Sequence, residues 1–353
     1  MSKFRAITLF LVVIVLVIGI APLAAQEEGE IETVCLVTDT GKVNDGSFNE
    51  YAYDGMEAAA EDFELETYFI ETVSATDYEA NIETCVNEGF DVVITVGYLI
   101  TDATVAAAEE NPDIYFIGID QFIVDGPENM VGIQFSEDQA GFLVGVLAAM
   151  VTETDIVAGV YGIDIPPVIK YRNGFEQGVA YVDEDIEVLG VYIDSFDAPD
   201  RGASAAEQFM GEGADVIFGA GGPTGSGGIL AAAAEGVWVI GVDKDEYFTT
   251  FGEGETDGAE YLISSAMKRV DQGVYNMLEV LYTGDEEVWA GGGLYILSVE
   301  NNGITFAGPH DADIDEEYYE ELKIVLRGLV EGEIEIGVDP VTGELLEEME
   351  SSD

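Results

Sequence analysis

Short runs rich in valine and isoleucine alternate with helical patterns along this chain of 353 residues, and this alternation strongly constrains the fold. The runs are continuous and apolar, as expected for parallel strands covered on both faces. Strands that alternate with helices of this length predict a parallel sheet with right-handed crossovers. The first series of predicted strands is Val34–Thr38, Thr67–Ile70, Val92–Val96, Tyr115–Ile119 and Met130–Phe135. The helices between them are predicted at Phe48–Ala60, Tyr78–Glu88 and Ala103–Glu110.

The same pattern begins again after a long apolar helix predicted at Asp138–Val151, whose narrow polar face indicates that it is mostly buried. The second series of strands is Ile156–Tyr161, Val188–Ile193, Val216–Phe218 and Val237–Val242. Its helices are predicted at Ile169–Tyr181, Ala203–Gly211 and Ile229–Glu235. After a strand-like run at Tyr261–Ser264, we predict a helix at Ala266–Leu281, two short strands and a last helix near Glu316–Val330.

Two consecutive α/β units, with no linker rich in proline or serine between them, predict two lobes. We expect residues 31–153 and 266–308 to form the first lobe, and residues 154–265 and 309–338 to form the second. In each lobe a parallel sheet is flanked by helices. Residues 339–353 form an acidic tail, and we expect its terminal stretch, Glu344–Asp353, to fray.

The first 25 residues are typical of a secretory signal peptide. Lys3 and Arg5 precede an uncharged apolar segment, Ala6–Ile20, and small residues lead up to Ala25. The apolar segment is short for a bilayer core of about 30 Å, which favours cleavage near Ala25 over a permanent membrane anchor. We therefore expect an exported protein, located in the periplasm or on the outer face of the cell membrane.

The charge of the chain excludes some partners. Acidic residues outnumber basic ones by 72 to 11, which gives a formal net charge of −61. Nucleic acids and anionic membranes are polyanions, so neither is expected to bind this chain. The hydrophobic content of 48% is high enough for a packed core. The charge does not identify a ligand, because a solvated acidic surface suited to salty surroundings explains it equally well.

The chain has two cysteines, Cys35 in a predicted strand and Cys85 in a predicted helix of the same unit. In an exported protein two cysteines can pair, and a bridge between these two elements is geometrically open. We nevertheless expect two buried free thiols, with the disulfide as the alternative.

A ligand site is expected in the loops that follow the strands, because open parallel sheets bind ligands beyond the carboxyl ends of their strands. In the first loop, Ser47 and Glu50 form a predicted capping box that begins the next helix. Capping explains Ser47, Glu50 and Asp45 without any ligand. It does not explain Phe48 and Asn49, because an aromatic ring there either packs under the loop or offers a stacking face to a cleft.

Further polar or glycine residues follow strands in both halves of the chain. A carboxylate at a strand end can accept hydrogen bonds from ligand hydroxyl or ring N–H groups, although a single one is usually a loop or cap residue. Several that converge on one edge of two lobes are better evidence for a site. The residues at these positions are Gly97, Tyr98, Asp120, Asp194, Phe196, Asp197, Gly221, Gly222 and Asp243.

Signatures of catalysis and of metal binding are weak. The glycine-rich turn Gly219–Gly228, with Asp243 after the next strand, gives limited support to a nucleotide-dependent enzyme. That turn lacks the ending of a phosphate loop and the dinucleotide fingerprint. His310 is the sole histidine, and no serine-hydrolase turn or zinc motif occurs. Asp311-x-Asp313-x-Asp315 resembles the start of a calcium loop, but its glycine and its final acid are missing. We expect no catalytic residue, metal or cofactor.

Several ordered blocks of the chain carry a resemblance to a known family. They are Thr38-Asp39-x-Gly41, Asp45-x-Ser47-Phe48-Asn49, Phe116–Gln121, Gly141–Gly145, Gly221-Gly222, Gly236–Asp243 and Ser265–Asp271. With these blocks the sequence resembles the basic membrane protein family of ABC-transporter substrate-binding proteins, whose best-understood members are purine nucleoside receptors. The resemblance runs from about Glu32 to about Val330, and it implies a two-lobed type I periplasmic-binding fold with a cleft between the lobes.

The resemblance also implies which residues meet the sugar of a nucleoside. Asp39 and Asp243 would contact the ribose, assisted by Lys268 and by the backbone of Gly222. Asn44, from the first loop, belongs to the same predicted ligand-binding set.

For the base, the resemblance implies two stacking rings and two polar readers. Phe48 would stack on one face and Phe196 would close from the other side, while Asn49 and Asp120 would read the edge of the base. Tyr98 completes the predicted ligand-binding set.

The chain departs from the family where many members carry a lipid-modified cysteine, because Gln26 stands at that place. The protein is therefore expected to diffuse freely or to keep its signal as an anchor. We expect a monomeric, non-enzymatic binding protein that delivers a nucleoside, with purines favoured, to an ABC permease. The alternatives are an exported nucleoside-sensing receptor that does not transport, and a nucleoside-processing enzyme.

Overall fold

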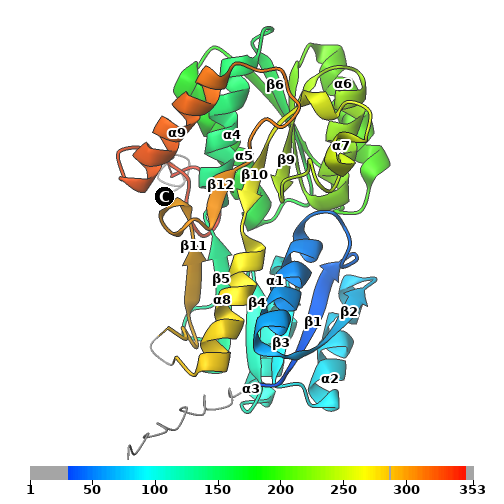
Figure 1. The fold of residues 1–353 in the computed structure, drawn as a ribbon, viewed down its shortest axis with the longest axis vertical. Coiled ribbons are helices and arrows are strands. Elements are labelled where there is room, and N and C mark those ends of the chain that lie inside the picture. Colours follow the sequence, from blue (N-terminus) through cyan, green and yellow to red (C-terminus); the bar gives the residue numbers. More distant parts are fainter. Residues whose placement is uncertain (1–30, 286–287, 347–353) are drawn as a thin grey trace, which may run out of the picture.

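The computed structural model of the protein describes residues 31–285 and 288–346. The predicted signal peptide and residues 347–353 of the acidic tail lie outside the described residues. Within the described part, the strands form two sheets of six strands each, one in each half of the molecule (Figure 1). The strand orders are β11-β5-β4-β3-β1-β2 and β12-β10-β9-β8-β6-β7, so the two halves repeat one topology.

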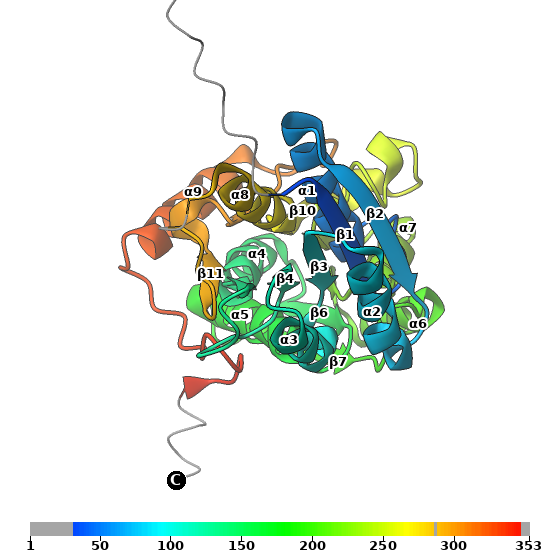
Figure 2. The same ribbon diagram turned by 90° about the horizontal axis from the view of Figure 1, so that it is seen from below.

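All strand pairs of the first sheet are parallel. Its strands are β1 (Thr33–Thr40), β2 (Glu66–Thr72), β3 (Val92–Val96), β4 (Tyr115–Ile119), β5 (Met130–Phe135) and β11 (Leu294–Leu297). The helices beside it are α1 (Phe48–Phe63), α2 (Tyr78–Glu88), α3 (Thr101–Glu110) and α8 (Val270–Thr283) (Figure 2). Every residue of β3 is buried, as expected for an inner strand covered on both faces.

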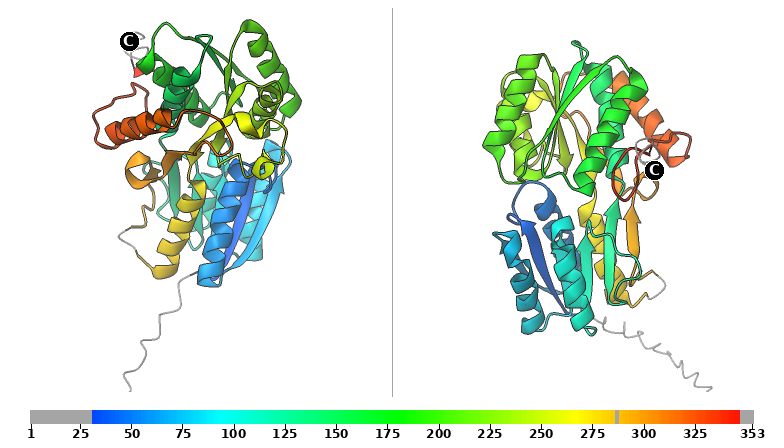
Figure 3. Two further views of the ribbon diagram at one scale, coloured as in Figure 1. Left: turned by 45° about the horizontal axis from the view of Figure 1, so that its top comes forward. Right: turned by 180° about the vertical axis from the view of Figure 1, so that it is seen from behind.

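The second sheet is parallel except at its edge, where β12 runs antiparallel to β10. Its strands are β6 (Ile156–Tyr161), β7 (Glu187–Tyr192), β8 (Val216–Ala220), β9 (Trp238–Asp243), β10 (Leu262–Lys268) and β12 (Ile304–Phe306). The helices of this half are α4 (Glu137–Val151), α5 (Pro166–Val182), α6 (Pro199–Glu212), α7 (Gly222–Ala234) and α9 (Glu316–Val330) (Figure 3). The alternation predicted from the sequence is confirmed in both halves.

Helix α4 is mostly buried, as its narrow polar face predicted, and it packs closely on α5. A methyl group on Gly141 would lie 2.3 Å from the carbonyl oxygen of Tyr171, and one on Gly145 would lie 2.2 Å from that of Phe175. Backbones that approach this closely leave no room for a Cβ atom. The two glycines on one face of α4 are therefore required by the helix contact.

The helix predicted at Ala266–Leu281 begins later than expected. Ala266, Met267 and Lys268 pair with β12, and Ala266 and Met267 also pair with β9, so these residues continue β10. Helix α8 begins at Val270 instead. Hydrogen bonds to two neighbouring strands, which the local sequence does not reveal, override the helical pattern of these three residues.

Sheet membership gives a basis for drawing the lobes. The chain crosses between the sheets after β5, after β10 and between β11 and β12. Helix α4 packs on α5, α9 and β10, all in the second half. We therefore propose that residues 31–135 and 270–297 form lobe 1, and that residues 137–268 and 304–338 form lobe 2. These limits differ from the expected ones mainly in placing α4, the end of β10 and β12 in lobe 2.

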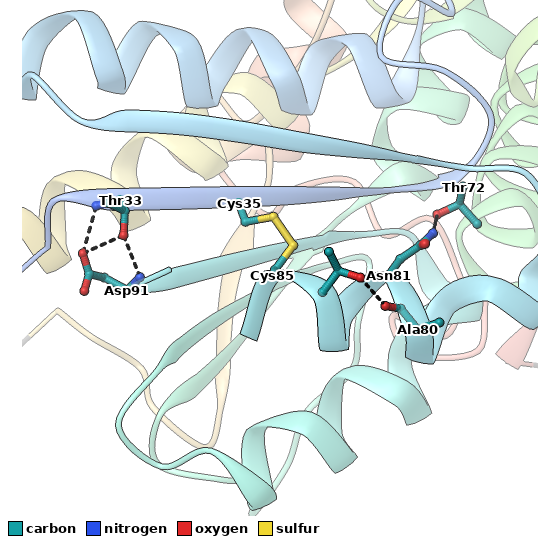
Figure 4. The surroundings of a disulfide bond; sticks show 8 residues. Thr33, Cys35, Thr72, Ala80, Asn81, Cys85 and Asp91 are labelled. Carbon is teal, nitrogen blue, oxygen red and sulfur yellow. Dashed lines mark hydrogen bonds between the residues drawn. A yellow bond between two sulfur atoms is a disulfide. The ribbon is translucent and has the colours of Figure 1, made fainter. Parts of the chain in front are cut away.

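The expectation of two free thiols is wrong. Cys35 in β1 and Cys85 in α2 form a disulfide with a Cα–Cα distance of 5.9 Å (Figure 4). Both side chains are fully buried. The sequence places the two residues in packed neighbouring elements, and the tertiary structure brings them within bonding distance.

Candidate ligand-binding cleft

A cavity of about 310 Å³ lies between the two lobes, at the lower end of the roughly 300–1,000 Å³ of small-molecule sites. It is formed by the loops that follow the carboxyl ends of strands in both sheets, as open α/β folds predict. The ten residues predicted from the sequence to meet a ligand all line it. They are Asp39, Asn44, Phe48, Asn49, Tyr98, Asp120, Phe196, Gly222, Asp243 and Lys268. Their contact with a ligand remains a prediction.

The loop between β1 and α1 is organised by Asp45, and the capping box predicted for Ser47 and Glu50 is wrong. The Asp45 carboxylate accepts hydrogen bonds from the backbone N–H groups of Ser47, Asn49 and Glu50. A carboxylate can satisfy several free N–H groups of a helix start at once. Ser47 makes no side-chain cap, and its hydroxyl donates instead to Asp243 of lobe 2, at 3.1 Å.

Asp39, the residue before the end of β1, is held on several sides. The Tyr78 hydroxyl and the Thr40 backbone N–H both donate to its Oδ1 atom. Its own backbone N–H donates to Oδ1 of Asn49, at 2.9 Å, and the Asn49 amide nitrogen donates to Asp45. Burial raises the pKa of Asp39, while the hydrogen bond from Tyr78 works in the opposite direction.

Two aspartates occupy equivalent strand ends in the two lobes. Asp120 follows β4 and Asp243 ends β9, and both have a φ of 61°. The left-handed region is uncommon for residues other than glycine, but aspartate tolerates it better than most. Gly97 after β3 and Gly221 after β8 also have positive φ angles, of 102° and 142°. These backbone turns direct the strand-end loops around the cavity.

Four buried charges form a chain behind the cavity. The Lys268 ammonium group lies 2.7 Å from a carboxylate oxygen of Asp120 and 2.7 Å from one of Glu137. Glu137 also lies 2.5 Å from Lys170, which donates to the carbonyl oxygen of Phe135. All four side chains are at most 6% exposed. The chain runs from the end of β4 in lobe 1 to α5 in lobe 2.

The pKa values of this cluster follow from burial and from the lysines. Burial raises the pKa of Asp120 to about 7, although Lys268 opposes the shift. Burial would also raise the pKa of Glu137, but Lys170 and Lys268 together hold it below its usual value. Burial disfavours the charge of Lys268, yet Asp120, Glu137 and Asp243 raise its pKa, so the group stays cationic.

Among the residues that the structure describes, Asp243 has no direct ion-pair partner. Its two oxygens accept hydrogen bonds from the hydroxyls of Tyr171 and Ser47, each at 3.1 Å. Burial raises its pKa, and the nearby charge of Lys268 and the two hydroxyls lower it. Ser47 belongs to lobe 1 and Asp243 to lobe 2, so this hydrogen bond joins the lobes across the cavity.

Two aromatic rings reach the cavity from opposite lobes. Phe48 begins α1, and the Lys268 ammonium lies 4.9 Å from the centre of its ring. Phe196 lies in the loop after β7, against Gly162, where a methyl group would come within 2.4 Å of the ring. Rings on the two sides of a cavity can hold a flat apolar group between them.

The sequence did not single out Tyr78, Tyr171, Glu137 or Lys170, although each supports a predicted site residue. Tyr171 itself lines the cavity. Lys170 could have been found from the sequence, because the chain has only 11 basic residues and this one lies next to apolar positions in a predicted helix. A buried lysine requires a carboxylate partner.

The glycine-rich turn Gly219–Gly228 contributes Ala220 and Pro223 to the cavity lining, besides Gly221 and Gly222. The motifs around His310 lie away from the cavity. His310 Nε2 lies 2.6 Å from Asp245, and its ring stacks on Tyr247. Asp311 accepts a hydrogen bond from Tyr247, and Asp315 caps α9 through the Glu317 N–H. Within residues 31–285 and 288–346, no group of three or more histidine, cysteine or acidic residues is arranged to hold a metal ion. The same residues include no helix long and apolar enough to cross a membrane.

Two repeated α/β lobes with a cleft between their strand ends define the type I periplasmic-binding fold. A solved solute-binding protein of an ABC transporter system from Aeropyrum pernix shares this fold, with a TM-score of 0.75 and 24% identity. That similarity covers 86% of this chain and 92% of the other.

Residues 32–339 match the family described as ABC transporter substrate-binding protein, PnrA-like, and the chain belongs to it. This confirms the resemblance seen in the sequence blocks. A "CD4+ T-cell-stimulating antigen" of Listeria monocytogenes is 30% identical over 87% of this chain and 88% of its own length. The "ABC transporter nucleoside-binding protein BmpA" of Lactococcus lactis is 29% identical over 80% of this chain and 84% of its own. The protein is thus the substrate-binding component of an ABC transporter.

Proposed function

We propose that this protein binds a purine nucleoside between its lobes and delivers it to an ABC permease outside the cytoplasm, without catalysing a reaction. The observation that carries this proposal is the pairing of aromatic and carboxylate groups in one cavity. Phe48 and Phe196 reach it from opposite lobes, and Asp39 and Asp243 line it from opposite sheets. A nucleoside has a flat base for the rings and hydroxyl donors for the carboxylates.

The charges of the cavity favour a neutral ligand. Asp39, Asp120 and Asp243 line it, and the Lys268 cation is already shared between Asp120 and Glu137. Lys42, the other lysine in the lining, is exposed, so a phosphate group held inside the cavity would meet more carboxylates than cations, which is costly. We expect nucleosides to bind and nucleoside phosphates to bind poorly.

Contacts between the lobes suggest how binding is communicated. Ser47 of lobe 1 donates to Asp243, and Lys244 of lobe 2 pairs with Glu50 and Asp54 of α1. A ligand that touches both lobes favours the closed arrangement, because it binds that arrangement more tightly than an open one. The permease would then recognise the closed pair of lobes. The relative named as a nucleoside-binding protein supports the choice of ligand.

Titration calorimetry with inosine, guanosine and adenosine tests the proposal. We expect at least one of them to bind with a Kd in the micromolar range or tighter, about −8 kcal/mol or better. Free ribose and inosine monophosphate, as matched controls, are expected to bind far more weakly. Mass spectrometry of the small molecule that co-purifies with the protein gives an independent check. If all three nucleosides are silent, the ligand assignment is wrong, while the fold and the family remain.

A further inference from the structure

Helix α2 is fastened to the strand that carries Asp39 by one continuous face. Tyr78, Ile82 and Cys85 lie on that face and are all buried. Cys85 is joined to Cys35 of β1, four residues before Asp39, and Tyr78 reaches Asp39 itself. Residues four apart in a strand lie on the same side of the sheet, and residues seven apart in a helix lie on one face. The disulfide and the hydrogen bond therefore join β1 and α2 at two points along their length.

A third contact fixes α2 lengthwise along the sheet. The Asn81 side chain donates to the hydroxyl of Thr72 at the end of β2, at 3.0 Å (Figure 4). The Thr72 hydroxyl in turn donates to the carbonyl oxygen of Thr38, next to Asp39. Helix α2 can thus neither slide nor rotate on β1 without breaking a covalent bond or a buried hydrogen bond.

The Asp39 carboxylate is confined by this arrangement. Its Oδ1 atom receives the Tyr78 hydroxyl and the Thr40 N–H. Its Oδ2 atom lies so close to Gly97 that a methyl group there would come within 2.4 Å. One oxygen is committed to the protein, and the other is fixed beside the bare backbone of Gly97. Tyr78 does not line the cavity, whereas Asp39 does.

We propose that Tyr78 is a positioning residue for ligand binding, acting through Asp39. Its hydroxyl donates to Oδ1 of Asp39 and so directs Oδ2 toward a hydroxyl of the ligand. The Cys35–Cys85 bond keeps α2 at the position along β1 that this hydrogen bond requires. The inference rests on the proposed function for the identity of the ligand. It explains why a tyrosine outside the cavity is buried against a carboxylate inside it.

A double-mutant cycle tests this role. Tyr78→Phe keeps the ring and removes only the hydroxyl, and Asp39→Asn removes the charge that it contacts. Tyr275→Phe is the matched control, because Tyr275 also donates to an aspartate of lobe 1, Asp62, and neither residue lines the cavity. Inosine binding is measured by calorimetry for the wild type, the single variants and the Tyr78→Phe/Asp39→Asn double variant.

We expect Tyr78→Phe to weaken inosine binding about tenfold, as for the loss of one hydrogen bond to a charged group. In the Asp39→Asn background the same change is expected to alter the affinity by less than about twofold, because contacts that act through one partner are not additive. Tyr275→Phe is expected to bind like the wild type.

Three results would contradict the inference in different ways. If Tyr78→Phe binds inosine within about twofold of the wild type, the hydroxyl does not position Asp39, although the proposed function stands. If Tyr78→Phe weakens binding equally in both backgrounds, its role is structural and the inference is wrong. If the wild type binds none of inosine, guanosine and adenosine, the proposed function fails first and the inference fails with it.

Discussion

The two lobes place an aspartate at the same point of the same topology, but they hold its charge in different ways. Asp120 of lobe 1 receives a lysine that comes from lobe 2, at 2.7 Å. Asp243 of lobe 2 receives two hydroxyls, one of them from Ser47 of lobe 1. Both side chains are about 5% exposed and both have left-handed backbones.

This difference shows that a repeated fold fixes where a charge stands but not how it is compensated. Asp120 belongs to an ion-pair network that also includes Glu137 and Lys170 of lobe 2, so this network joins the two lobes. Asp243 keeps neutral partners, and a neutral hydroxyl of a ligand can replace or join them at little electrostatic cost. Lobe 1 also carries the disulfide of the chain, whereas both cysteines are absent from lobe 2.

Removing the cation that lobe 2 supplies to Asp120 is expected to have the largest effect. Lys268→Met leaves Asp120 buried without its cation and is expected to lower the free energy of unfolding by about 3–5 kcal/mol, the cost of breaking a buried ion pair. Tyr171→Phe removes one of two hydroxyls from Asp243 and is expected to cost about 1.5–3 kcal/mol. Urea denaturation of both variants measures the difference, and equal costs would show that the two aspartates are held alike.

The disulfide gives the next largest effect. Replacing Cys35 and Cys85 together by alanine opens a loop of 50 residues and is expected to destabilise lobe 1 by about 2–4 kcal/mol. Hydrogen exchange read by mass spectrometry separates the lobes. Amides of β1 and α2 are expected to exchange faster, while those of β6 and β8 keep their protection. Equal acceleration in both lobes would mean that they unfold as a single unit.

The two aromatic rings allow the lobes to be compared in ligand binding. Phe48→Ala is expected to weaken the binding of a purine nucleoside by about 1–3 kcal/mol, the range for base stacking on an aromatic ring. Phe196→Ala tests the face that lobe 2 supplies and is expected to fall in the same range. Calorimetry with inosine measures both, and the weak binding of ribose should not change. A loss confined to Phe48→Ala would assign the base to lobe 1 alone.

The last comparison depends on pH and concerns a buried acid of lobe 2. Burial raises the pKa of Glu246 to about 7, and the hydrogen bonds from Thr250, the Val242 N–H and Ser226 oppose this shift only in part. None of these three partners is a cation. The folded protein thus keeps this proton up to about pH 7, whereas the unfolded chain releases it near 4.5.

This contribution to stability therefore falls as the pH rises from about 4.5 to about 7, because the folded state binds more protons in that interval. Glu246→Gln is expected to remove this part of the slope. Thermal melts of both proteins at several pH values provide the measurement, and an unchanged slope would show that Glu246 is ionised in the folded state.

The strand-end residues show which parts of the site can be predicted from local sequence patterns. Asp120 and Asp243 were predicted as candidate site residues because each comes directly at or after an apolar strand, and the carboxyl ends of parallel strands meet at one edge. Asp39 was predicted from the resemblance to a known family. Their neighbours were not predictable in the same way. Tyr78 contacts Asp39 across 39 positions of sequence, and Lys268 contacts Asp120 across 148.

The sequence by itself determined the alternation of strands and helices, the two halves of the chain, and strand-end residues of the cleft such as Asp120 and Asp243. Each of these follows from periodicity or from position relative to a strand, which are local properties, whereas Lys268 and Asn49 were predicted from the resemblance to a known family. The tertiary structure alone decided that Cys35 and Cys85 pair, that Ala266–Lys268 extend a strand, and that Asp45 rather than Ser47 caps α1. Each of these depends on a partner that only folding brings within reach, because a hydrogen bond or a covalent bond needs its two atoms a few ångströms apart.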